Sequence, residues 1–172
     1  MPRPHLGLFV EGNDDERFFK RVLHSKFKKK YQTEVHIIRY QEIKKGAIEG
    51  YIKSFDYNCF FFRDNDHGDC KKFCEKLLKD YDKLSKEKII VIIEEIESWY
   101  LAGINKEVAK QYKIKLDTTT DNLTKEHFKD IIKKSLFGYD ITDAMSEILI
   151  KFNFEQAKKR NSSFNSFCES HL

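Results

Sequence analysis

The first half of the chain alternates between short apolar runs and longer amphipathic stretches. The apolar runs cover residues 6–10, 35–38, 58–62 and 89–93, and the last is an unbroken series of β-branched residues. Helical patterns cover residues 13–30, 43–55 and 69–84. Strands that alternate with helices predict a parallel sheet, and unbroken β-branched runs are typical of its buried strands. We therefore expect an α/β fold: a Rossmann-like parallel four-stranded sheet flanked by helices.

The pattern changes in the second half. Residues 94–103 predict a loop that leads into a short helix, with Trp99 as a core anchor, and residues 113–122 are polar and rich in threonine. Short helical patterns follow near residues 124–136, 141–152 and 154–170. We expect an α/β domain over residues 1–111 and a helical extension over 112–172 that packs on the same core.

Composition excludes several classes of protein. The chain has 172 residues, of which 35% are charged and 40% hydrophobic, and this balance is too apolar for a disordered segment. Its net charge of +4 permits contact with polyanions but is lower than in strongly basic DNA-binding modules. No apolar run reaches the length of a membrane span and no signal peptide precedes the first strand, so we expect a cytoplasmic protein without a membrane partner.

The cysteines do not indicate a disulfide scaffold or a zinc site. Four cysteines in a chain of this length agree with a reducing compartment. His67, Cys70 and Cys74 lack the paired spacing of zinc ligands. Cys70 and Cys74 are four residues apart, which predicts one helix face packed against the core.

Carboxylates follow the predicted strands. Glu11 comes directly after the first strand, Asp64 and Asp66 follow the third, and Glu97 follows the fourth. Ligands bind beyond the carboxyl ends of the strands in open parallel sheets. Clustered carboxylates repel one another unless a cation lies between them, and oxygen ligands suit Mg²⁺, with Mn²⁺ as a substitute. We expect Glu11, Asp64 and Asp66 to lie close enough to share one metal ion, and Glu95 or Glu97 is a further candidate ligand for a second ion.

Helix capping is the alternative explanation for acidic residues in these positions. Asp14, Asp15 and Asp69 fit the N-termini of helices, and Asn13 with Glu16 resembles a capping box. Capping explains less well the position of Glu11 and the paired spacing of Asp64 and Asp66.

Basic residues flank the acidic positions. We expect Arg63, Lys71 and Lys72 to contact the phosphates of a substrate. Residues 28–30 and 158–160 are also basic, and for these a solvated helix end and a phosphate contact remain equal alternatives.

Two segments resemble the motifs of a known domain. Phe9-Val10-Glu11-Gly12 is similar to the glutamate motif of the TOPRIM domain, and Phe62-Arg63-Asp64-Asn65-Asp66 is similar to its DxD motif. The resemblance covers roughly residues 5–105. The segments 95–102 and 161–167 look most like small stand-alone TOPRIM-like proteins of the OLD and abortive-infection group. The resemblance implies a Rossmann-like sheet in which Glu11 is the general acid or base and Asp64 and Asp66 hold Mg²⁺.

Two functions follow as expectations from these residues. The first is a Mg²⁺-dependent nuclease, or a related phosphoryl-transfer enzyme, that acts on DNA or RNA in phage defence. The second is a non-catalytic TOPRIM-like module that works with a partner ATPase. A phosphoacceptor receiver domain ranks below both, because Glu94, Glu95 and Glu97 stand where a receiver has a lysine, and they would repel a phosphorylated aspartate.

Overall fold

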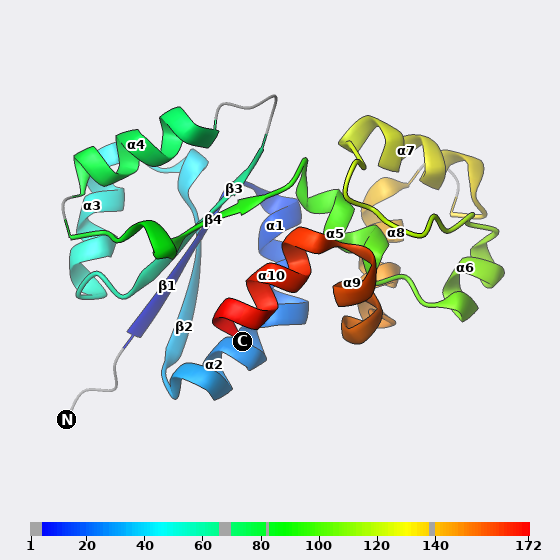
Figure 1. Ribbon diagram of the computed structural model, residues 1–172, viewed down its shortest axis with the longest axis horizontal. Helices are drawn as coiled ribbons and strands as arrows, with labels where there is room; N and C mark the ends of the chain where they lie inside the picture. The colour runs from blue at the N-terminus through cyan, green and yellow to red at the C-terminus, as the bar shows by residue number, and fades with distance from the viewer. Residues whose placement is uncertain (1–4, 66–69, 82, 138–139) are drawn as a thin grey trace. The chain divides into compact units, whose positions relative to one another are not determined.

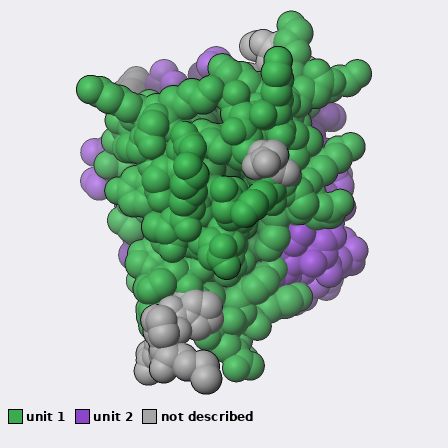
Figure 2. All heavy atoms as spheres, turned by 90° about the vertical axis from the view of Figure 1, so that its left-hand side faces the viewer, with its two compact units in different colours: residues 1–92 green, residues 93–172 purple. Residues whose placement is uncertain are grey.

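The computed structural model describes residues 5–65, 70–81, 83–137 and 140–172. The chain divides into two compact units, residues 1–92 and 93–172, which are coloured separately in Figure 2.

The first unit is built on a parallel four-stranded sheet. Its strands are β1 (His5–Val10), β2 (Glu34–Arg39), β3 (Cys59–Asp64) and β4 (Ile89–Ile92), in the spatial order β2-β1-β3-β4. Leu8 pairs with Ile37 of β2 and with Phe60 of β3, and Asp64 pairs with Ile92 of β4. The expected α/β fold with a four-stranded parallel sheet is therefore confirmed.

Helical segments connect the strands of the first unit. They are α1 (Asn13–Phe18), a π-helical turn (Phe19–Leu23), α2 (His24–Tyr31), α3 (Lys45–Ser54) and α4 (Cys70–Asp80), with short 3-10 helices at Tyr40–Glu42 and Lys86–Lys88. The prediction of a capping box at Asn13 and Glu16 was wrong by one residue. Gly12 precedes the helix in an extended conformation, and its backbone N–H donates to Asp15 Oδ2 at 3.2 Å. Asp15 is therefore a capping residue, as its position after the strand suggested.

The two faces of the sheet carry separate sets of helices, which Figure 1 shows on opposite sides of the strands. Phe60 and Phe62 pack against Phe27 of α2. Phe9 and Phe61 stack on one another, with ring centroids 4.4 Å apart, in the core that includes residues of α3 and α4. Successive side chains of each strand thus lie on opposite faces of the sheet and pack against different helices.

The strand order places a topological switch between β1 and β3. The chain leaves β1 toward the face covered by α1 and α2, and it leaves β3 toward the face covered by α3 and α4. Connections that depart to opposite faces open a crevice beyond the carboxyl ends of the two strands. Glu11 and Asp64 lie at this edge, at the ends of neighbouring strands.

Gly7 of β1 is required by a close contact. A Cβ atom at this position would lie 2.5 Å from Cδ2 of the buried Phe55 ring. We expect Gly7→Ala to lower the free energy of unfolding by about 2 kcal/mol, because the ring must move within a packed core.

In α3, a Cβ at Gly50 meets no atom within 4 Å, so Gly50→Ala should raise stability by up to about 1 kcal/mol. Urea unfolding measures both, and equal midpoints for Gly7→Ala and the wild type would contradict the argument.

The second unit consists of short helices. They are α5 (Ile96–Ala102), α6 (Lys106–Tyr112), α7 (Lys125–Lys134), α8 (Ile141–Ile150), α9 (Phe154–Arg160) and α10 (Ser162–His171). Trp99 is fully buried and its ring lies 5.0 Å from that of Phe164, so its expected role as a core anchor is confirmed. None of the helices in the described ranges has the length and apolarity needed to cross a membrane.

The boundary between the units differs from the predicted one at residues 111 and 112. It falls directly after β4, and within the second unit α5 packs with α7, α8 and α9. The apolar residues of α5 supply the core that residues 112–172 lack on their own.

Candidate functional site

Glu11 is the centre of a polar cluster at the carboxyl edge of the sheet. Its side chain is buried, with only 8% of the residue exposed. The backbone N–H of Asp64 donates to Glu11 Oε1 at 3.0 Å, and Arg63 Nη1 lies 3.2 Å from the same oxygen. Gln41 Nε2 donates to Glu11 Oε2 at 2.6 Å. The carboxylate therefore joins the ends of β1 and β3 to the residues that follow β2.

Arg63 lies between the carboxylate and an aromatic ring. Its guanidinium carbon is 4.9 Å from the centroid of Phe73 in α4, a distance at which a cation is attracted to the ring face. Side-chain alternation along β3 places Arg63 on the face of Phe61. Arg63 was expected to contact substrate, and the structure places it beside Glu11, where it holds a positive charge at the edge of the sheet.

Tyr40 is the third polar group on this face. Burial, and then the negative charge of Glu11, raise the pKa of the Tyr40 phenol, whereas Arg63 acts in the opposite direction. The phenol therefore keeps its proton at neutral pH and can only act as a hydrogen-bond donor or as a neutral acceptor.

The predicted metal ligands occupy different positions. Asp64 ends β3, and alternation places its side chain on the face of Phe60 and Phe62, opposite to that of Arg63. Asp66 lies outside the described residues. Within the described ranges no group of three or more histidine, cysteine, aspartate or glutamate side chains could hold a metal ion. Mg²⁺ in proteins commonly uses one or two carboxylates and keeps several waters, so the hard oxygens of Asp64 remain chemically suited to it.

Glu97 belongs to the second unit. It is 2% exposed, and Lys125 Nζ lies 3.1 Å from its Oε1 atom. The backbone N–H of Lys125 donates to the carboxylate of Glu95. Glu97 Oε2 is buried and accepts no hydrogen bond from the described residues. The contacts of Glu97 in this unit are thus an ion pair within the helical core.

Lys71 and Lys72 lie in the first turn of α4 and are exposed. This turn is attached to the end of β3, because Cys70 Sγ donates to the backbone oxygen of Asp64 at 3.2 Å. The two lysines predicted to bind phosphate therefore lie in a helical turn that is hydrogen-bonded to the end of β3, where Asp64 is located. Burial raises the pKa of the Cys70 thiol to about 11, as expected for a structural cysteine.

Sequence reasoning missed two residues of the cluster, Tyr40 and Gln41. They follow β2 directly, so the strand ending at Arg39 was the available signal. Polar residues after that strand reach the same sheet edge as Glu11 because β2 is the neighbour of β1.

We compared the chain with protein-family models, curated proteins and solved structures. None of them matches. The TOPRIM resemblance therefore rests on the two motifs and on the segments 95–102 and 161–167 of the sequence.

The two other segments of that resemblance contact each other in the second unit. Trp99 Nε1 donates to Ser163 Oγ at 2.8 Å, and Asn161 Nδ2 donates to Ser98 Oγ at 3.3 Å. These side chains are buried. The segments 95–102 and 161–167 thus form one buried polar network, which is a structural role.

Arg160 is not a solvated helix end, so that alternative is wrong for this residue. It is buried and donates to the backbone oxygens of Leu101 and Asp117 at 3.0 and 2.9 Å. These bonds satisfy carbonyls at the end of α5 and in the loop that follows α6.

Proposed function

We propose that this protein is a Mg²⁺-dependent nuclease, a phosphodiesterase acting on DNA or RNA. The observation that carries the proposal is the contact between Glu11 Oε1 and the backbone N–H of Asp64, at the topological switch of a parallel sheet. This edge is where open α/β sheets bind ligands. The contact brings the glutamate of the first motif to the first aspartate of the second.

The residues of the cluster suit separate roles. Glu11 is held in place on both oxygens by donors from β3 and from the segment after β2. We assign it the exchange of protons with the attacking and leaving oxygens. Arg63 supplies positive charge for the phosphate, and Lys71 and Lys72 extend that charge along α4. Asp64 and Asp66 would hold Mg²⁺, which neutralises the phosphate when bound.

The reaction is the hydrolysis of a phosphodiester. A water oxygen forms a bond to phosphorus, and the bond from phosphorus to the leaving sugar oxygen breaks. Glu11 accepts the proton of the water and returns it to the leaving oxygen, so that no other reactant is consumed. The setting that we propose, phage defence, rests on the resemblance to OLD and abortive-infection proteins.

The test is cleavage of a panel of single-stranded and duplex DNA and RNA with Mg²⁺, with Mn²⁺ and with a chelator. We expect cleavage products with either metal and none with the chelator. A folded protein that leaves every substrate intact with both metals would overturn the proposal.

A non-catalytic module is the second candidate, and one observation favours it. Both oxygens of Glu11 already accept hydrogen bonds or an ion pair, so the carboxylate also acts as a clamp between strands. Such a module would work with a partner ATPase and would bind metal weakly. Calorimetric titration with Mn²⁺ separates the candidates, because a tight site that is lost in Asp64→Asn would favour the nuclease.

A further inference from the structure

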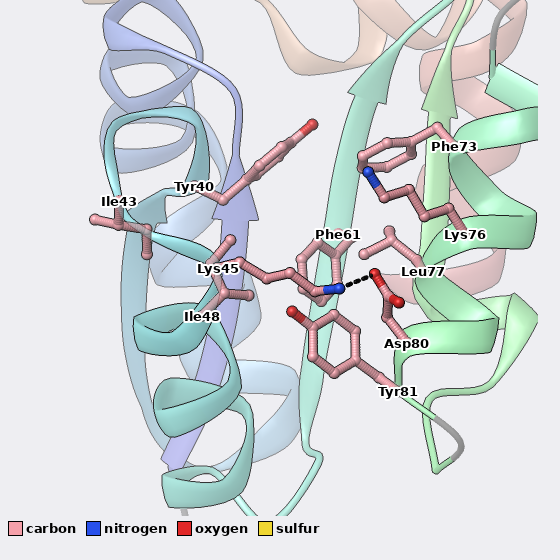
Figure 3. A pocket seen from close by; sticks show the side chains of 10 residues that line it. All are labelled: Tyr40, Ile43, Lys45, Ile48, Phe61, Phe73, Lys76, Leu77, Asp80 and Tyr81. Carbon is pink, nitrogen blue, oxygen red and sulfur yellow. Dashed lines mark ion pairs between the residues drawn. The ribbon is translucent and has the colours of Figure 1, made fainter.

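A pocket lies between α3 and α4, on the face of the sheet that carries Glu11 and Arg63. Its volume is about 240 Å³, and Figure 3 shows Phe61 of β3 at its floor. Ile48 of α3 and Leu77 of α4 face each other across it. The walls are apolar, and the nuclease roles assigned above use none of these three residues.

Four of the ten residues that line the pocket are aromatic. Tyr40, Phe61, Phe73 and Tyr81 all border the pocket. The rings of Tyr40 and Phe73 are stacked, with centroids 5.9 Å apart and planes inclined by 27°, so they form one aromatic surface at one end of the pocket. A flat heteroaromatic ring is the ligand that gains most from such walls, because it stacks on rings and leaves little polar surface to desolvate.

The rim is charged and predominantly positive. Lys45 of α3 pairs with Asp80 of α4 at 2.8 Å across the pocket, as the dashed line in Figure 3 shows. Lys76 also lines the rim, where its charge, like that of Lys45, lowers the pKa of Asp80, so the rim carries two cations for one carboxylate. One cation therefore remains for an anionic group attached to the ring.

Two residues that line the pocket, Tyr40 and Phe73, also interact with the Glu11 cluster. Tyr40 lines the pocket, and the charges of both Glu11 and Arg63 act on its phenol. The guanidinium of Arg63 lies over the ring of Phe73, which also lines the pocket. A ring bound in the pocket would therefore place its attached phosphate beside Arg63.

We propose that this pocket receives an unpaired nucleobase, so that the substrate is single-stranded nucleic acid. A base in a duplex is stacked and paired, and it can enter an apolar slot between two helices only after it leaves the stack. The inference rests on the proposed nuclease function for the phosphate that would lie at Glu11. The base is bound by the rings and the phosphate by Arg63 and Lys76.

The test measures binding in the presence of a chelator, so that no cleavage occurs. The probes are short single strands of DNA and of RNA that carry a fluorescent purine analogue, and the corresponding duplexes. Ile48→Trp fills the pocket from α3, and Phe73→Leu removes a ring while keeping an apolar side chain. Tyr51→Trp is the matched control, because Tyr51 lies on the same helix, is exposed and does not line the pocket.

We expect each of the two pocket variants to bind a single strand about tenfold more weakly than the wild type, and the control to bind it equally well. The analogue should lose fluorescence on binding to the wild type, because stacking quenches it. Equal binding by the wild type and both folded pocket variants would overturn the inference. Tighter binding of the duplex than of the single strand would overturn it as well.

The outcome is distinguishable from failure of the nuclease proposal. If the protein cleaves with metal but the pocket variants bind single strands as well as the wild type, the base-binding proposal is overturned and the nuclease proposal stands. If the pocket variants bind single strands more weakly but no cleavage occurs with either metal, the nuclease proposal is overturned and the base-binding proposal stands.

Discussion

Glu11→Gln is expected to reduce metal-dependent cleavage by about a thousandfold, the contribution of a positioned general acid or base. The substitution keeps the size of the side chain and one oxygen, which can still accept from Asp64 N–H and Arg63. The new amide group would face Gln41, whose own amide can turn to offer its oxygen. The fold should therefore survive, and only proton transfer is lost. Initial rates with saturating Mg²⁺ measure the effect.

Glu49→Gln is the matched control for this variant. Glu49 is an exposed residue of α3 that pairs with Lys53 at 2.6 Å, and its loss of charge should leave the rate unchanged. Asp64→Asn should act differently, by weakening the binding of Mn²⁺. If folded Glu11→Gln cleaves at the wild-type rate, Glu11 has no catalytic role, and its function is to hold the ends of β1 and β3 and the segment after β2 together.

Asn161→Leu is expected to lower the free energy of unfolding of the second unit by about 3 kcal/mol. Asn161 is 1% exposed, and its Oδ1 accepts from Ser163 Oγ at 2.8 Å and from the Phe164 N–H at 2.9 Å. Its Nδ2 donates to Thr120 Oγ1 at 3.1 Å and to Ser98 Oγ. Leucine has a similar volume but satisfies none of these groups. The loss is therefore one of hydrogen bonds rather than of packing.

Trp99 provides the measurement for this prediction. It is the single tryptophan of the chain, and its Nε1 donates to Ser163 of the same network. Its fluorescence in urea therefore reports unfolding of the second unit. Asn165→Leu, at a half-buried residue of α10 whose partner Glu169 is exposed, should change stability by less than about 0.5 kcal/mol. Equal midpoints for Asn161→Leu and Asn165→Leu would show that the network does not hold this unit together.

The strands and their order along the chain follow directly from the sequence. The unbroken β-branched residues 89–92 and the apolar residues 6–10 fall in β4 and β1 as expected. These patterns are local, since a period of two or of 3.6 residues is visible within one window of sequence. Capping is also local, but the exact cap depended on Gly12, whose extended backbone moved the helix start by one residue.

The contacts of the candidate site have no such local signal. Gln41 and Asp64 reach Glu11 from 30 and 53 residues away in the sequence. Which residues meet depends on the strand order and on the face to which each side chain alternates. The sequence indicated that Glu11 and Asp64 end neighbouring elements, but it did not show that Arg63 lies against Glu11.

The sequence by itself determined the α/β class, the parallel strands and the sheet edge at which Glu11 and Asp64 end their strands, because hydrophobic periodicity encodes each of these element by element. Only the tertiary structure decided the unit boundary after β4, the ion pair between Glu11 and Arg63, and the aromatic pocket between α3 and α4. Each of these depends on side chains from separate elements that meet only when the sheet is assembled and its two faces are covered.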